Sequence, residues 1–141
     1  LVDFVPGGEN TIDWTAKISF ESFSDLVDIN PEEMLIDVIS KDSQRCNFVQ
    51  HANLFSGLEN NYPTSVRLYL CDRSSITEKD EIKIVKATQG KHYFYVIRIV
   101  SRIAPFEEDM SNFSKDVIAT WSTYLRGITL CDDAQSLHPC T

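Results

Sequence analysis

Alternating hydrophobic and polar positions predict that most of this chain is β-structure. Apolar residues at every second position over Thr11–Phe23 are typical of a half-buried strand. The same alternation predicts strands over Ser65–Cys71, over the stretch that begins at Glu81, and over His92–Ser101. We interpret the apolar run Met34–Ser40 as one more strand, which brings the total to five.

Two segments show helical spacing instead. Phe48, Ala52 and Phe55 predict a short helix between residues 46 and 59. Near the C-terminus, a helix is expected to begin at Ser111 or Asn112 and to end at Gly127. Its apolar face would hold Val117, Ile118, Trp121, Tyr124 and Leu125.

The number and length of the strands favour a small barrel. A sandwich of the immunoglobulin type needs about seven strands, whereas long first and fifth strands suit closure of a five-stranded barrel. We therefore expect a mainly β fold: a five-stranded barrel of the oligonucleotide/oligosaccharide-binding (OB) type with a C-terminal helix and a short helix between strands two and three. Residues 1–10 would lead in, 11–126 form the domain, and 127–141 form a tail or linker.

The net charge of −8 argues against a protein that coats phosphates, although a local basic groove would suffice for nucleic-acid binding. No apolar run is long enough to span a bilayer, and the acidic start of the chain does not resemble a signal peptide. We therefore expect no membrane partner.

Four cysteines, Cys46, Cys71, Cys131 and Cys140, lack the close pairing of a zinc site, so no metal is expected. Because Cys71 ends an apolar strand pattern, reduced thiols in an intracellular protein are favoured over two disulfides. The chain carries neither a nucleophile motif nor a phosphate-binding glycine loop. We expect neither enzymatic activity nor a cofactor nor a small-molecule substrate.

Four segments resemble the telomere-end-binding family, which includes the protection-of-telomeres proteins. Residues 79–88 look like that family's fourth strand, and residues 66–70 look like its third. Residues 102–106 stand where its fifth strand leaves the barrel, and residues 116–122 are similar to its closing helix. The resemblance implies a nuclear domain at chromosome ends that binds single-stranded telomeric DNA and meets other telomere proteins.

The resemblance also implies where the DNA would bind. In OB barrels, bases stack on aromatic rings of the open face while cations hold the phosphates. Tyr69, Phe23 and Tyr93 would stack, and the phosphate contacts would come from Arg67, Lys83, Lys86 and Lys91, with His92 beside the turn at Gly90. Lys83 and Lys86 take the two basic positions of the family's fourth strand.

Two other hypotheses remain open. The same barrel could be a module that binds a partner protein, which would suit its acidic character. Alternatively, the chain is a secreted β-domain with two disulfides.

Overall fold

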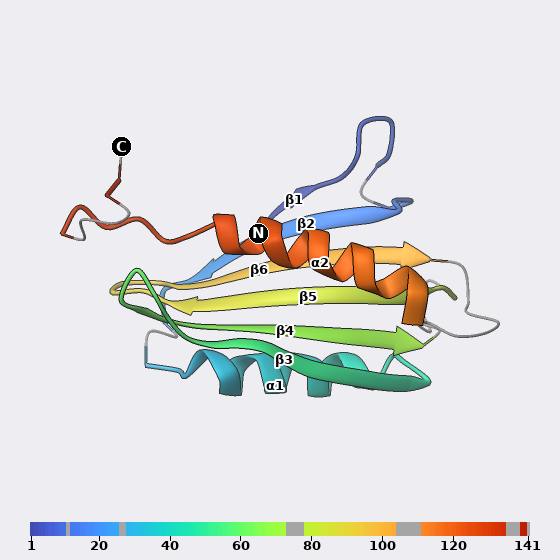
Figure 1. Cartoon of the computed structure of the whole chain (residues 1–141), viewed down its shortest axis with the longest axis horizontal. Coiled ribbons are helices and arrows are strands. Elements are labelled where there is room, and N and C mark those ends of the chain that lie inside the picture. Colours follow the sequence, from blue (N-terminus) through green and yellow to red (C-terminus); the bar gives the residue numbers. More distant parts are fainter. Residues whose placement is uncertain (11, 26–27, 73–77, 104–110, 135–138, 141) are drawn as a thin grey trace.

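The computed structural model of the chain consists of one open antiparallel sheet with a helix on each face (Figure 1). It describes residues 1–10, 12–25, 28–72, 78–103, 111–134 and 139–140. The strand order across the sheet is β1-β2-β6-β5-β4-β3. In chain order the elements are β1 (Val2–Phe4), β2 (Ala16–Phe23), α1 (Pro31–Ser43), β3 (Phe48–Glu59), β4 (Tyr62–Asp72), β5 (Asp80–Gln89), β6 (Phe94–Ile103) and α2 (Ser111–Gly127).

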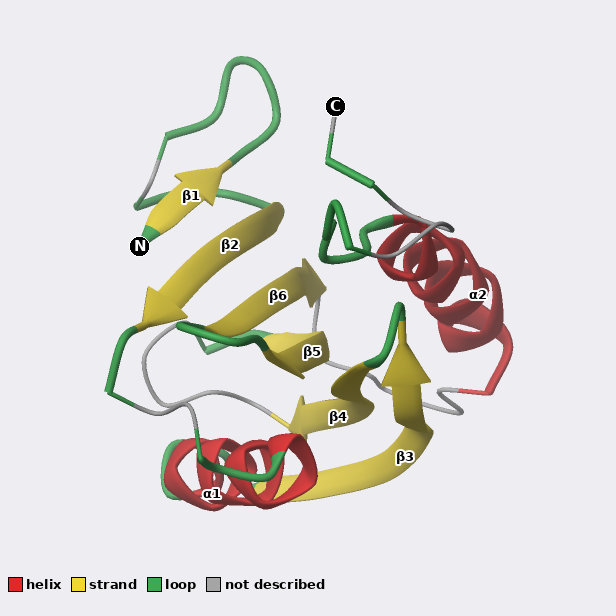
Figure 2. Cartoon of the chain, turned by 90° about the vertical axis from the view of Figure 1, so that its left-hand side faces the viewer, coloured by secondary structure: helices red, strands yellow, loops and turns green. Residues whose placement is uncertain are grey.

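The predicted OB barrel is wrong, because the sheet does not close. β1 and β3 form its two opposite edges and are not neighbours. In a closed barrel, one wall would cover the apolar face of the other. Here α2 does this instead, with Leu125 packed against a cluster on that face that includes Val66, Ile84 and Ile99. The predicted C-terminal helix is therefore present, but it lies along the sheet rather than over the end of a barrel (Figure 2).

The segment Met34–Ser40 is part of helix α1 and not a strand. Asn30 caps this helix, since its Oδ1 accepts a hydrogen bond of 2.8 Å from the backbone N–H of Glu32. Pro31 occupies the first turn, where its missing N–H costs nothing. Leu35 and Ile39, four residues apart, bury one face of the helix against the sheet.

The short helix predicted between residues 46 and 59 is the edge strand β3. A bulge between Asn53 and Phe55 shifts its register against β4, so that Leu54 and Phe55 both pack against the apolar cluster under α2. This break in alternation is what imitates helical spacing. Asn60 and Asn61, both with positive φ, make the two-residue turn into β4.

The two faces of the sheet have separate cores. On the α1 face, Leu35 and Ile39 pack against Tyr69, Val85, Ala87, Phe94 and Val96. On the other face, α2 packs against the cluster around Ile84, and Trp121 is partly buried beside it. Figure 2 shows α1 and α2 on opposite sides of the curved sheet.

All four cysteines are paired, contrary to the expectation of reduced thiols. Cys46 bonds to Cys71 and Cys131 bonds to Cys140. The first disulfide joins the segment after α1 to the end of β4, beside the hydrogen bond from Asn47 N to the Asp72 carbonyl oxygen. Within the described residues, neither helix has the length and apolar character that a membrane crossing requires.

Candidate ligand-binding cleft

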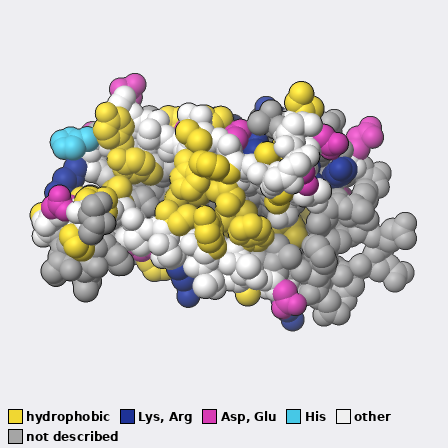
Figure 3. Space-filling model, turned by 90° about the horizontal axis from the view of Figure 1, so that it is seen from above, with side chains coloured by type: hydrophobic (Ala, Val, Ile, Leu, Met, Phe, Trp, Pro, Cys, Tyr) yellow, Lys and Arg dark blue, Asp and Glu magenta, His cyan; other side chains and the backbone are white. Residues whose placement is uncertain are grey.

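An apolar cleft lies on the α2 face of the sheet, between the β1–β2 edge and the chain that leaves α2. Its volume is about 360 Å³. Its apolar walls come from β1, β2, β6 and the segment after α2, and are formed by Leu1, Val2, Phe20, Tyr95, Ile97, Ile128 and Leu130. Seen from above, hydrophobic side chains gather in a patch at the middle of the molecule (Figure 3).

The cleft exists because α2 covers only part of its face of the sheet. Leu125 of α2 is 1% exposed and lies over the centre of the sheet, against Ile84 of β5. β1 adds only three residues at the far edge and pairs with β2, with Phe4 contacting Phe20 edge to face at 5.9 Å. The strip between these elements is left without a helix above it.

The polar groups on the floor of the cleft already have partners. Lys86 is 2% exposed, and its Nζ donates hydrogen bonds to the carbonyl oxygens of Leu125 (2.9 Å) and Ile128 (2.7 Å). The same ammonium forms an ion pair with Glu59. These three acceptors match the three N–H donors of a lysine. The hydroxyls of Thr88 and Thr64 bond to each other at 3.2 Å, so the floor is polar but satisfied.

The predicted nucleic-acid residues do not form one surface. Arg67, Tyr69 and Lys83 lie on the α1 face, under or beside the helix, whereas Lys86 lies on the opposite face. Arg67 is 9% exposed and binds Glu32 of α1 at 3.2 Å and Nδ1 of His51 at 3.1 Å. The helix that covers these residues occupies the space in which a DNA strand was expected.

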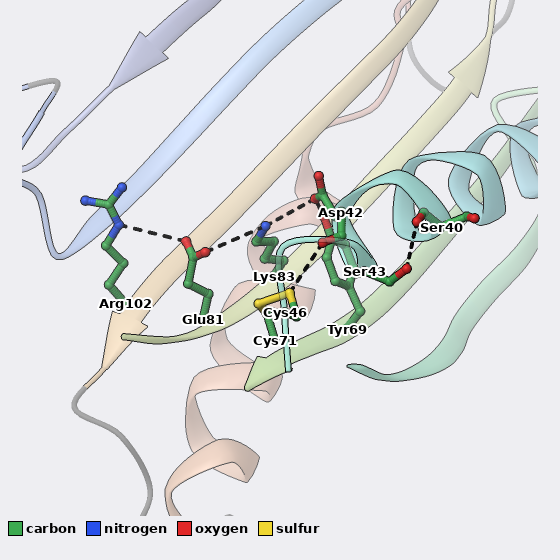
Figure 4. Close-up of polar contacts among 9 residues, drawn as sticks. All are labelled: Ser40, Asp42, Ser43, Cys46, Tyr69, Cys71, Glu81, Lys83 and Arg102. Atoms are coloured by element: carbon green, nitrogen blue, oxygen red, sulfur yellow. Dashed lines mark hydrogen bonds and ion pairs between the residues drawn. A yellow bond between two sulfur atoms is a disulfide. The ribbon is translucent and has the colours of Figure 1, made fainter. Parts of the chain in front are cut away.

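Tyr69 is a core residue. It is 1% exposed, and its hydroxyl donates a 2.6 Å hydrogen bond to Asp42 of α1. Burial, and then the neighbouring Asp42 carboxylate, raise the pKa of Tyr69. Burial also raises the pKa of Asp42, but hydrogen bonds from Tyr69 and Lys83 outweigh it, so that the pKa of Asp42 is lowered overall. Figure 4 shows the chain of contacts from Arg102 through Glu81 and Lys83 to Asp42.

The remaining predicted residues lie at the end of the sheet where β5 turns into β6. Lys91 binds Asp132 at 2.9 Å, His92 is exposed, and Tyr93 is 46% exposed with its ring 6.3 Å from that of Tyr95. Phe23 is partly buried against the core on the α1 face. Tyr93 is thus the one predicted stacking residue with a substantially exposed ring.

Sequence reasoning missed the residues of the cleft. The sequence places Phe20 in the predicted strand Thr11–Phe23, and Tyr95 and Ile97 in the predicted strand His92–Ser101. Their alternation identifies the face they share, but only the position of α2 shows that this face is partly open. Across the described residues, no three His, Cys, Asp or Glu side chains group in the manner of a metal site.

Comparison with solved structures shows a similarity of fold. The fold is similar to that of PA94 from Pseudomonas aeruginosa, which is described as a protein of unknown function and a candidate regulator. The two chains are 5% identical; the match covers 93% of this chain and 83% of PA94, with a TM-score of 0.61. Neither a family model nor a curated protein matches the chain. The resemblance to the telomere-end-binding family is therefore wrong, because the fold it implied is a closed barrel and the sheet here is open.

Proposed function

We propose that this domain is a non-catalytic binding domain whose cleft takes a slender, uncharged apolar molecule such as a single hydrocarbon chain. The observation that carries the proposal is the open apolar strip between the β1–β2 edge and the segment after α2. Small-molecule sites are mostly apolar cavities with a few polar groups, and about 360 Å³ lies in their usual range of about 300–1,000 Å³.

The size of the cleft distinguishes between apolar ligands. The volume of about 360 Å³ is near the lower end of the usual range for small-molecule sites, about 300–1,000 Å³. A hydrocarbon chain or a narrow ring system suits a site of this size.

The charge of the cleft argues for an uncharged occupant. The ammonium of Lys86 is committed to two carbonyl oxygens and to Glu59. An anionic head group could recruit it only by breaking the contacts that hold the end of α2. The ligand therefore contributes an apolar segment to the cleft and leaves any charged end in solvent.

The disulfides support a site of action outside the reducing compartments. Structural disulfides are typical of secreted and periplasmic proteins and are rare in the nucleus. Two of them in this chain favour an oxidising compartment over the nuclear location that the discarded resemblance implied. The binding of single-stranded DNA stays a prediction, and the residues predicted to contact DNA do not share one surface.

The test is a titration with uncharged n-alkyl compounds of increasing chain length below their micelle concentration, followed by calorimetry. Each added methylene contributes about 0.8 kcal/mol, so affinity should rise about fourfold per methylene until the cleft is full and then level off. Competition against a labelled telomeric single strand would detect the alternative ligand in the same samples.

A matched pair of variants locates the binding. Val2→Asp places a carboxylate in the wall of the cleft, and Ile36→Asp makes the same change on the exposed side of α1. Val2 and Ile36 are 54% and 50% exposed, so both variants should fold. The first should abolish the chain-length dependence and the second should keep it. Equal affinities of all chain lengths, or equal loss in both variants, would refute the proposal.

A further inference from the structure

A second hollow lies on the opposite face of the sheet, beyond the C-terminal end of α1. Its volume is about 290 Å³, and β2, β4, β5, β6 and the segment after α1 contribute to its walls. We call it the polar pocket. Five cations line it: Lys17, Arg45, Lys83, Arg98 and Arg102.

The polar pocket has more basic than acidic residues, whereas the whole chain has more acidic than basic residues. The whole sequence has 13 basic and 21 acidic residues and a net charge of −8. The lining of the pocket includes only two acids, Asp42 and Glu81. Two more acids bind its cations from outside the lining, Glu21 at 2.6 Å from Arg98 and Asp3 at 3.6 Å from Lys17. Even with these, the cations outnumber the acids.

The cations also offer more hydrogen-bond donors than their neighbours accept. Arginine has five N–H donors and lysine three. Glu81 lies 3.8 Å from both Lys83 Nζ and Arg102 Nε, which is beyond hydrogen-bond distance. Arg102 Nε is buried and has no hydrogen-bond partner within the described part of the chain. Arg98 donates from Nη1 to Glu21, and among the described residues this contact leaves most of its planar fork for another acceptor.

The walls hold these cations in place. The guanidinium of Arg102 stacks on the ring of Trp14 at 3.4 Å, and Lys17 Nζ lies 4.9 Å from the same ring. Asp42 fixes Lys83 at 3.1 Å. Lys17 and Arg98 each keep 24% of their side-chain surface exposed, so they remain accessible from solvent.

We propose that the polar pocket is a binding site for a small oxyanion, a carboxylate or a phosphate group, held chiefly by Arg98 and Lys17. A planar guanidinium matches both groups with two parallel hydrogen bonds. Arg45, which is exposed at the rim, supplies further positive charge. This site is independent of the apolar cleft, since the two lie on opposite faces of β2 and β6.

The experiment is an NMR titration of backbone amides with inorganic phosphate and, separately, with acetate, at a constant ionic strength set with sodium chloride. Saturable shifts centred on β2 and β6 are expected for at least one of the two anions. A preference for phosphate would indicate phosphate esters as ligands, and a preference for acetate would indicate carboxylates. Shifts that never saturate, or that spread evenly over the surface, would overturn the proposal.

Two variants with the same substitution distinguish a site from general charge. Arg98→Gln should weaken binding about tenfold or more, as expected for the loss of a charge-assisted hydrogen bond. Arg126→Gln removes the same charge from the exposed side of α2 and should leave the affinity unchanged. Lys17→Gln should also weaken binding, and it tests the same pocket if Arg98→Gln fails to fold. Equal affinities in Arg98→Gln and Arg126→Gln would reject the pocket as a site.

Discussion

The disulfide between Cys46 and Cys71 should contribute a large part of the stability of the domain. It closes a loop of 25 residues, which contains the β3–β4 hairpin. In the chain-entropy relation, a cross-link over this span stabilises the folded state by about 3.5 kcal/mol at 25 °C. Single domains are stable by about 5–15 kcal/mol in total, so opening this one bond should remove a quarter or more of the free energy of unfolding.

The second disulfide provides an internal comparison. Cys131 and Cys140 are nine residues apart, and the same relation gives about 2.6 kcal/mol. Both of these residues are exposed, whereas Cys71 is 2% exposed. Because this loop is the shorter of the two, its contribution should be smaller than that of the Cys46–Cys71 bond.

The measurement is urea unfolding followed by the fluorescence of Trp14 and Trp121, in a variant with Cys131→Ala and Cys140→Ala. In that background, a reductant opens the Cys46–Cys71 bond alone and needs no substitution at either of these two cysteines. The free energy of unfolding should fall by about 3.5 kcal/mol, and the slope against urea should rise because the unfolded chain becomes less compact. A fall of less than about 1 kcal/mol, or a larger loss on removing the Cys131–Cys140 bond from the native chain, would refute the reasoning.

Three further predictions concern charged groups with defined partners. Lys86→Met should lower the free energy of unfolding by about 3 kcal/mol in urea titrations, because it leaves Glu59 and two carbonyl oxygens unpaired; a loss below about 1 kcal/mol would contradict this role. The pKa of Asp42 is lowered from its ordinary value of 3.8, so its stabilisation is present above that pH and disappears as the pH falls through the lower folded value. Asp42→Asn should accordingly destabilise the domain at pH 7 and progressively less as the pH falls below 3.8, and a penalty independent of pH would be inconsistent with this. Hydrogen bonds from Tyr62 and Lys91 lower the pKa of Asp132 to about 2. The NMR titration of the Asp132 carboxyl carbon should therefore have its midpoint near this pH. A midpoint near 3.8 would show that Asp132 does not bind Tyr62 and Lys91 in solution.

Much of the sheet could be predicted from the sequence, because the residue patterns that indicate strands are local. The strands β4, β5 and β6 are rich in β-branched and aromatic residues and alternate over part of their length, as in Val66–Leu70 and Glu81–Ile84. The error at Met34–Ser40 arose from an apolar run that fits either period. There Asn30, Pro31, Glu32 and Glu33 carried the better signal, because a cap, a first-turn proline and first-turn acids together favour a helix.

The sequence did not predict that the sheet is open or where the apolar cleft and the polar pocket lie, because both depend on contacts between distant segments. A barrel and an open sheet can contain the same alternating strands and differ only in whether the outermost two meet. The edge strand β1 has three residues, too few to show a period. The bulge at Asn53–Phe55 interrupts the alternation of β3, the other edge strand, so the pattern did not indicate a strand. Asn60-Asn61 between two apolar runs nevertheless indicates a hairpin turn.

The two lysines predicted to contact DNA instead hold the two helices in place beside the proposed binding sites. Lys83 and Lys86 lie three positions apart on β5 and therefore point to opposite faces. Lys83 binds Asp42 in the last turn of α1, and Lys86 binds the carbonyl oxygens at the end of α2. A cation is favoured at the negative end of a helix, so each lysine holds one helix against the same strand. Because both helices are fixed near β5, they leave parts of β2 and β6 uncovered, and the apolar cleft and the polar pocket include these parts on opposite faces of the sheet.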